Sequence, residues 1–444
     1  MLRKSAASAL CVSNGSLECI ARRVAGPPSR TFSSSTRQNA MLGHFTPAST
    51  PELDELLSMI RTKVILPSYL PTEQRKKIAS PKYKKKLQSD PITIEIDGEV
   101  TKFQHQNPFV DIPQTRRSVM SAITKFETAE DFANLRPLLE GIAYANRKFP
   151  ASFYNKIVRN VGSKGRISLI IQCARGVAKT GLKLDSSEKV METLHFVQMH
   201  AVEANYDSAA TAKALRWADM VVEMLQEKGH KPHLPKDKIK VKGELPLYRD
   251  PMTILAQLHL AAALIVRGEP QVAETNAEAS AEANAEAEAE DESEGEVEAT
   301  SEGEVETTSE GEIEATSEEK REVKFEPKVV AKKFAKYGRD LGRLWPKDKK
   351  LLEVQPAALF EVPSKLGYLR EPNRFVSLAT PLLRGLEMAV EAAETLKKPV
   401  LTENLSSRRD ILASEIQEAR TAAAATGKNT RCEEVWTKFY GNEA

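Results

Sequence analysis

Apolar residues recur at three- and four-residue spacing between Arg116 and Gly268, over several consecutive stretches that are each long enough for a helix. This spacing places them on one face of an α-helix, so each stretch predicts an amphipathic helix. Helix-breaking residues such as Gly181, Ser186 and Pro251 separate the stretches. The pattern predicts antiparallel helices around the chain's one substantial core. Its apolar positions are Phe153, Ile157 and Val161; Leu169, Ile170, Cys173 and Val177; Val190, Leu194, Val197 and Ala201; Leu215, Ala218, Val222 and Leu225; and Ile254, Leu258, Ala261, Ala262 and Ile265.

The expected helices are spaced like those of a solenoid. Ser152 and Ser186, which mark two helix starts, are 34 residues apart, close to the period of helix-turn-helix repeats. Residues 153–185 resemble one pentatricopeptide or tetratricopeptide unit, and the stretch that follows, to Pro232, resembles a second. Two imperfect units do not establish a repeat array, because any helical hairpin with short turns gives similar spacing. Both interpretations mean stacked helix pairs with a continuous apolar seam.

The pattern is different before this region. Thr50 and Pro51 suit the start of a short helix that ends at Arg61. Further on, isoleucines alternate with polar residues at 92, 94 and 96, and Asp97-Gly98 is typical of a two-residue turn, so residues 91–103 predict a β-hairpin. Because an isolated hairpin is marginally stable, we expect it to rest on the helical body or on a partner.

Between the short helix and the hairpin, the chain is strongly basic and interrupted by prolines. Such an arm has too little apolar surface to fold alone. Lysines and arginines that alternate with an aromatic residue, here Tyr83, often become ordered on nucleic acid, where they neutralise phosphates. A solvated linker is the alternative. On charge alone, the candidate RNA-binding residues in and beyond this arm are Arg75, Lys76, Lys77, Lys82, Lys84, Lys85, Lys86, Arg116, Arg117, Lys332, Lys333, Lys336 and Arg339.

Residues 273–319 are a low-complexity acidic segment with an eight-residue repeat that begins at Ser293, Ser301 and Ser309. Repelling like charges and recurrent glycines predict no stable structure there. Between Glu274 and Glu319 lie 19 acidic residues and no lysine or arginine. The formal net charge of +2 therefore hides a remainder with 64 Lys and Arg against 43 Asp and Glu, a net +21. This excess favours a polyanionic partner such as RNA.

The C-terminal region resumes a basic, helical pattern from Lys320, and its basic positions include Lys328 and Arg343. Residues 372–397 predict a long helix that is interrupted near Pro381, and residues 406–426 predict another. The tail places Val435, Trp436, Phe439 and Tyr440 at helical spacing. We expect that apolar cluster to dock onto a core or a neighbour.

The composition of the N-terminus predicts that the protein is imported into mitochondria. Residues 1–37 contain six Lys or Arg, many Ser and Ala, and a single acidic residue, Glu18, which is the balance of a matrix transit peptide. Arg30-Thr31-Phe32-Ser33 suits a processing site after Phe32. A disordered basic N-terminus of a nuclear or cytosolic protein is the alternative.

No motif indicates a reaction, a cofactor or a small-molecule substrate. Ala178-Lys179-Thr180 ends a helix and lacks the glycine of a phosphate loop. His195 and His200 do not share a helix face, and His230 and His233 suit a surface loop better than a metal site. The four cysteines show no CxxC spacing, and no apolar run is long enough to span a membrane; residues 252–266 suit a buried helix.

Together these patterns predict a mainly α protein: stacked, solenoid-like antiparallel helix pairs with a small β-hairpin, extended basic arms and a disordered acidic insertion. The expected organisation is a transit peptide (1–37), a basic N-terminal arm with a short helix and the hairpin (38–114), a helical body (115–268), the acidic insertion (269–320) and a basic helical C-terminal region (321–444).

This organisation resembles the mitochondrion-specific proteins of fungal mitochondrial ribosomes. Leu135-Arg136-Pro137-Leu138-Leu139 and Phe153-Tyr154-Asn155-Lys156 look most like the large-subunit protein numbered fifty in the unified nomenclature. The resemblance implies a non-catalytic component of the mitochondrial ribosome, in the matrix, that binds mitochondrial ribosomal RNA and neighbouring ribosomal proteins. The alternatives are a pentatricopeptide-like organelle RNA-binding or translation factor and an assembly factor for a respiratory complex.

Overall fold

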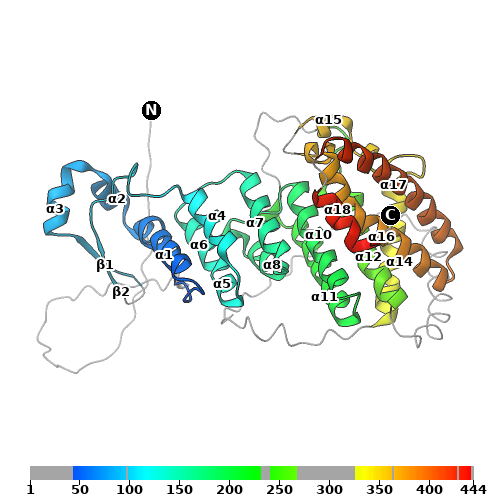
Figure 1. The fold of residues 1–444 in the computed structure, drawn as a ribbon, viewed down its shortest axis with the longest axis horizontal. Helices are drawn as coiled ribbons and strands as arrows, with labels where there is room; N and C mark the ends of the chain where they lie inside the picture. Colours follow the sequence, from blue (N-terminus) through cyan, green and yellow to red (C-terminus); the bar gives the residue numbers. More distant parts are fainter. Residues whose placement is uncertain are drawn as a thin grey trace, which may run out of the picture. The chain divides into compact units, whose positions relative to one another are not determined.

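The computed structural model describes residues 44–96, 99–231, 241–267, 326–362, 365–427 and 430–441 (Figure 1). The candidate transit peptide, the acidic insertion, the Asp97-Gly98 turn and His233 lie outside these residues. The described part is mostly helical with one two-stranded sheet, which confirms the predicted fold class. Its first helices are α1 (Pro51–Ile60), α2 (Thr72–Ala79), α3 (Lys84–Ser89), α4 (Thr115–Lys125), α5 (Ala129–Ala133), α6 (Leu135–Tyr144), α7 (Ala151–Ser163), α8 (Ile167–Arg175) and α9 (Val177–Thr180).

The later helices continue the same stacked arrangement and then add a C-terminal set. They are α10 (Ser187–Glu203), α11 (Ser208–Gln226), α12 (Pro251–Arg267), α14 (Pro327–Leu344), α15 (Ala357–Glu361), α16 (Pro372–Thr395), α17 (Pro399–Ala425) and α18 (Thr430–Tyr440). Helix α7 packs against α4, α8 and α10, and α10 packs against α11 (Figure 1). The sheet consists of β1 (Ile92–Ile96) and β2 (Glu99–Phe103).

The five apolar stretches predicted from spacing form helices α7 to α12. Two expected breakers act at helix starts: Ser186 is the N-cap of α10 and Pro251 begins α12. Helix α11 is capped by Asp207, which is not among the expected breakers and whose carboxylate accepts the Ala210 N–H. Gly181 ends α9 with φ of +70°, a left-handed conformation in which a side chain would be strained. The local signals therefore place the helix ends correctly to within a few residues.

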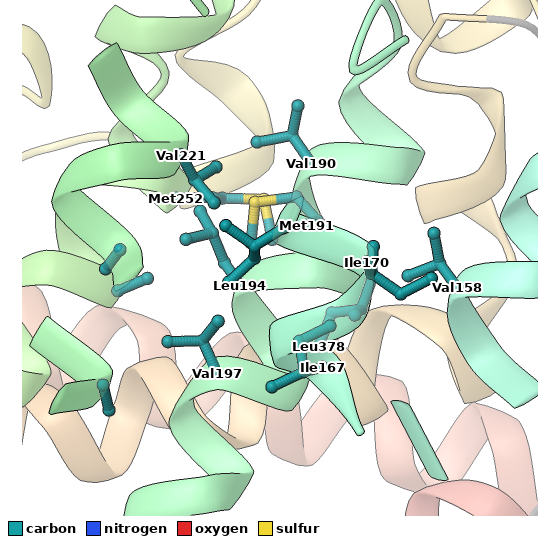
Figure 2. Close-up of a cluster of buried hydrophobic side chains, with 14 of the residues drawn as sticks. Val158, Ile167, Ile170, Val190, Met191, Leu194, Val197, Val221, Met252 and Leu378 are labelled. Carbon is teal, nitrogen blue, oxygen red and sulfur yellow. The ribbon is translucent and has the colours of Figure 1, made fainter. Parts of the chain in front are cut away.

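Helix α12 is buried on all sides, from Pro251 through Ile265. It packs against α10, α11, α14 and α16. Figure 2 shows the buried cluster beside it, where Ile170 of α8, Leu194 of α10, Met252 of α12 and Leu378 of α16 converge. The main core is thus larger than the expected one, because C-terminal helices cover the faces of α12 that residues 116–268 alone would leave exposed.

The C-terminal helices differ from expectation at two points. Helix α17 begins at Pro399, seven residues before the predicted start at residue 406. Helix α16 runs unbroken through Pro381, where the sequence predicts an interruption. Proline has no N–H, so Pro381 removes one hydrogen bond of the helix, the one that the Ser377 carbonyl would accept. Packing against α12, α17 and α18 then holds the helix together across the proline. The tail cluster docks on α16 through α18, as expected.

A buried ion-pair network links helix α18 to helices α7 and α10. Glu192 of α10 is 1% exposed and accepts from Arg159 of α7 (2.7 Å) and from Arg431 of α18 (2.7 and 3.1 Å). Burial alone would raise the pKa of Glu192, but the two guanidinium groups outweigh it and hold the pKa below its ordinary value. The carboxylate is therefore the charged link between three helices.

The basic arm folds together with the hairpin. Leu66, Leu70, Ile78, Leu87 and Phe103 form a small second core, and Ile92, Ile94 and Ile96 pack against it. The strands pair antiparallel from Ile92 with Phe103 to Ile96 with Glu99, which confirms the predicted hairpin register. Neither the arm nor the hairpin has enough apolar surface to fold alone, so each buries its apolar side chains against the other. We refer to residues 66–106 as the basic N-terminal unit.

Candidate nucleic-acid interface

The candidate cations of the basic N-terminal unit all point to solvent. Helix α2 buries Ile78 and helix α3 buries Leu87, and the helical period turns the neighbouring lysines and arginines outward. The exposed cations are Arg75, Lys76, Lys77, Lys82, Lys84, Lys85 and Lys86. Within the described part of the chain, none of these seven side chains forms an ion pair.

The charge in this region is almost entirely positive. Residues 61–86 contain nine Lys or Arg and one acidic residue, Glu73. Tyr83 lies among these cations and is 38% exposed. Unpaired cations at this density attract a polyanion, because each phosphate they neutralise releases condensed counterions. The arrangement is suited to the RNA backbone.

Helix α14 presents a second basic surface. Lys328, Lys332, Lys336, Arg339 and Arg343 are exposed and follow one another at spacings of four, four, three and four residues, which places them in one stripe about 22 Å long. The opposite face buries Val330, Phe334, Tyr337 and Leu341 in the main core. The stripe is therefore held on a packed helix.

Lys333 differs from its neighbours on α14. Its Nζ lies 2.7 Å from Oδ2 of Asp219 on α11, and Asp219 also accepts from the Tyr337 hydroxyl and from Gln257. Burial, and then the Asp219 carboxylate, raises the pKa of Tyr337. Four residues of α14 were chosen by charge. Lys332, Lys336 and Arg339 face solvent, whereas Lys333 joins α14 to α11.

The remaining candidates, Arg116 and Arg117, are exposed in the first turn of α4. They belong to a helix of the main core, as α14 does, whereas the seven cations of the N-terminal unit surround the small core. The structure thus distributes the candidates over three surfaces. Sequence reasoning omitted Lys63 and Arg147, which are far apart in the sequence and come to line one cavity with Arg75 only through the fold.

The buried histidines are structural. His230 is 1% exposed, which corrects its expected place in a surface loop, and its Nδ1 accepts the Leu184 N–H at 3.0 Å. His259 contacts Gln198 and the Tyr206 hydroxyl, and burial lowers its pKa to about 3. Among the described residues, no group of three His, Cys, Asp or Glu side chains could hold a metal ion. The same residues include no helix that is both long and apolar enough to cross a membrane.

Comparison with known proteins identifies the family. The chain matches the family described as mitochondrial ribosomal protein mS27 over residues 30–324 and 315–440, which is most of its length. It is also 31% identical over 379 residues to the small ribosomal subunit protein mS27 of Neurospora crassa, across 84% of this chain and 83% of that protein. The chain belongs to the mS27 family of mitochondrial ribosomal proteins.

Membership of the mS27 family corrects the choice of subunit. The resemblance to large-subunit protein fifty is wrong, because the relative is a small-subunit protein. The residues that suggested it, around Leu135–Leu139 and Phe153, are ordinary core positions of α6 and α7, which any helix of this kind would fill with similar side chains. The broader expectation is confirmed: this mS27-family chain has a structural role in the mitochondrial ribosome and resides in the mitochondrial matrix.

Proposed function

We propose that the chain is a structural component of the small subunit of the mitochondrial ribosome that binds ribosomal RNA through its basic surfaces and neighbouring ribosomal proteins through its helical body. The similarity to a small-subunit protein over most of both chains supports the choice of subunit. The seven exposed, unpaired cations of the basic N-terminal unit support contact with RNA. No catalytic step is part of this proposal.

The observation that carries the RNA contact is the density of exposed, unpaired cations in the basic N-terminal unit. In the helical body, charged groups such as Glu192, Arg431 and Lys333 are committed to partners within the chain. In the basic N-terminal unit, the cations Lys82, Lys84, Lys85 and Lys86 have no such partner among the described residues, although like charges so close together repel one another. A bound polyanion neutralises these charges at fixed positions, whereas water and salt only screen them.

Subunit assignment is tested on a sucrose gradient of mitochondrial lysate in high salt and in magnesium-depleted buffer, with the chain quantified in each fraction. We expect equimolar comigration with the small subunit after the subunits separate. Comigration with the large subunit would overturn the choice of subunit. Presence only in light fractions would indicate a soluble RNA-binding or assembly factor instead.

The RNA contact is tested by replacing Lys82, Lys84, Lys85 and Lys86 together with Glu. Phosphate contacts become repulsive, so we expect the variant to leave the small subunit at lower salt than the wild-type chain. The matched control makes the same four-fold charge reversal at exposed lysines elsewhere: Lys179, Lys183, Lys228 and Lys231. Equal salt resistance of the arm variant and the wild type would remove this unit from the RNA interface.

A further inference from the structure

A small cavity lies where the basic N-terminal unit meets the end of α6. Its volume is about 140 Å³, and its walls come from the turns after α1, from α2, from the connector before α4 and from the residues after α6. Three cations line it: Lys63, Arg75 and Arg147. Ligand sites for small molecules usually measure about 300 Å³ or more, so this cavity is too small for a typical metabolite. It is of a size to admit one phosphate group.

The charges at this cavity are unopposed. No acidic residue lines it among the residues that the structure describes, and in that part of the chain the three cations form no ion pair. The nearby carboxylate of Asp111 accepts the backbone N–H of Asn107 at 2.7 Å. By contrast, a larger groove of about 630 Å³ between α11, α12 and α14 is of mixed charge: four acidic residues line it together with Arg175, Arg216 and Lys333. Only the small cavity therefore combines cations with no acidic lining residue, which favours an anion such as phosphate.

An exposed aromatic residue stands on the connector that forms one wall. Residues 107–111 make a tight turn in which Asn107 Oδ1 accepts the Phe109 N–H and the Asn107 carbonyl accepts the Asp111 N–H at 2.9 Å. Phe109 is 94% exposed at this turn and Val110 is 78% exposed. The hydrogen bonds fix the turn, so the ring is presented to solvent by a defined backbone.

A second aromatic residue lies at the end of α6. Tyr144 is 50% exposed and packs on Tyr69, with ring centroids 4.8 Å apart. Asn146 then adopts φ of +52°, and the Arg147 N–H donates to the carbonyl of Ile142, the hydrogen bond of a helix-ending left-handed turn. This turn fixes the backbone of Arg147 at the cavity. Tyr144 thus lies one helical turn before Arg147, and Phe109 lies on the connector whose Gln106 and Ile112 line the cavity.

We propose that this surface binds an unpaired nucleotide of single-stranded RNA, with a phosphate between Lys63, Arg75 and Arg147 and a neighbouring base stacked on Phe109. The proposal rests on the proposed function in that RNA is the partner, and it adds which form of RNA is recognised. A paired base hides both of its faces within the duplex, so only an unpaired base can stack on a protruding ring.

The stacking contact is tested with the full-length chain and fluorescence anisotropy. The probes are a fluorescein-labelled 12-nucleotide oligouridylate and a 12-base-pair RNA duplex. Phe109→Ala should weaken binding of the single strand by roughly 5- to 150-fold, the range measured for loss of one base-stacking ring, and leave duplex binding unchanged. Val110→Ala removes a similarly exposed apolar side chain from the same turn and should change neither affinity.

The phosphate contact is tested by Lys63→Gln, Arg75→Gln and Arg147→Gln in one chain. Each phosphate contact to a single strand contributes about −0.7 to the slope of log affinity against log salt, so the slope should become shallower by up to about 2. The control replaces three exposed cations elsewhere, Lys179, Lys183 and Lys228, with Gln and should keep the wild-type slope. Thermal unfolding of each variant checks that the fold is retained.

The possible results separate this proposal from the proposed function. If the wild-type chain comigrates with the small subunit while Phe109→Ala binds oligouridylate as the wild type does, only the nucleotide site is wrong. If the wild type prefers the duplex, the single-strand assignment is wrong. Binding of a polyglutamate peptide in place of RNA would assign the surface to an acidic protein and overturn the proposal. A wild-type chain that migrates apart from the small subunit contradicts the proposed function itself.

Discussion

The helices of the basic N-terminal unit bury far fewer residues than helix α12 does. Helix α12 buries 15 consecutive residues, Pro251 to Ile265, whereas α2 and α3 each bury one, Ile78 and Leu87. A fully buried aliphatic side chain contributes about 1.5–3 kcal/mol to the free energy of folding. The N-terminal unit is therefore the weaker part and keeps its charges at the surface, while α12 holds the main core together.

The two regions also differ in how their charges are used. In the main core, buried charges have partners: Glu192 has two arginines, and Arg408 donates to the carbonyl of Trp345. In the N-terminal unit, the lysines stand free in solvent. Charge that stabilises the fold must be committed to the chain, whereas charge that binds a partner must remain available. The same types of charged residue can therefore stabilise the main core in one region and bind a partner in the other.

The largest effect on stability should come from Glu192→Ala in the main core. Removing this carboxylate leaves the partly buried Arg431 without its ion-pair partner and leaves Arg159 with Glu188 alone, which should cost up to about 3–5 kcal/mol in the free energy of unfolding. Urea unfolding followed by circular dichroism measures the cost. As a control, Glu203→Ala breaks an ion pair with Lys438 in which both side chains are about half exposed, and it should cost less than about 1 kcal/mol. Equal losses would show that burial does not decide the value of these ion pairs.

A second pair of substitutions compares the two cores directly. Leu258→Ala should lower the free energy of unfolding of the whole helical body by about 2–5 kcal/mol, because it leaves a cavity among α10, α12 and α16. Leu87→Ala should instead open the N-terminal unit alone. Hydrogen exchange should then rise in residues 72–103 while the helical body keeps its protection. Loss of protection throughout the chain in Leu87→Ala would show that the two cores unfold together.

The third prediction concerns a buried carboxyl at the start of α12. Burial raises the pKa of Asp250 to about 6, and its partners are the neutral Met252 N–H and Gln355 amide. Because the folded pKa exceeds the unfolded value of about 3.9, this carboxyl favours folding below pH 4 and loses that contribution as pH rises through 6. Asp250→Asn should therefore match the wild type at pH 4 and exceed its stability by up to about 3 kcal/mol at pH 8.

Asp131, at the start of α5, is the matched opposite of Asp250. Burial alone would raise its pKa, but hydrogen bonds from Ser49, Thr128 and Glu127 outweigh burial and hold the pKa well below its ordinary value. Its contribution to stability is present above pH 4 and is lost as pH falls. Asp131→Asn should therefore destabilise the chain at pH 7. The same pH trend for both variants, measured by thermal unfolding from pH 2 to pH 8, would contradict these assignments.

Local patterns in the sequence were sufficient for the helices of the body and for the hairpin, but not for α2 and α3, which lie in the arm that the sequence predicts to be extended. Apolar spacing, Ser186 and Pro251 determined α10 and α12, and the alternation of Ile92, Ile94 and Ile96 determined the strands. These signals are local because they depend on hydrogen bonds and side-chain directions within one element. Charge also identified the exposed lysines of the N-terminal unit, since a dense basic run has few places other than the surface.

Tertiary contacts decided what local signals could not. Packing against α16 helps to bury α12, and α16 continues as one helix across Pro381. His230 is buried, and Lys333 forms an ion pair with Asp219. Tertiary contacts also brought Lys63, Arg75 and Arg147 to one cavity. The physical reason is the same in each case: the free energy depends on groups far apart in the sequence, and no spacing rule connects them. The sequence by itself determined the helices of the body, and only the packing among the elements decided which charges remain free to bind.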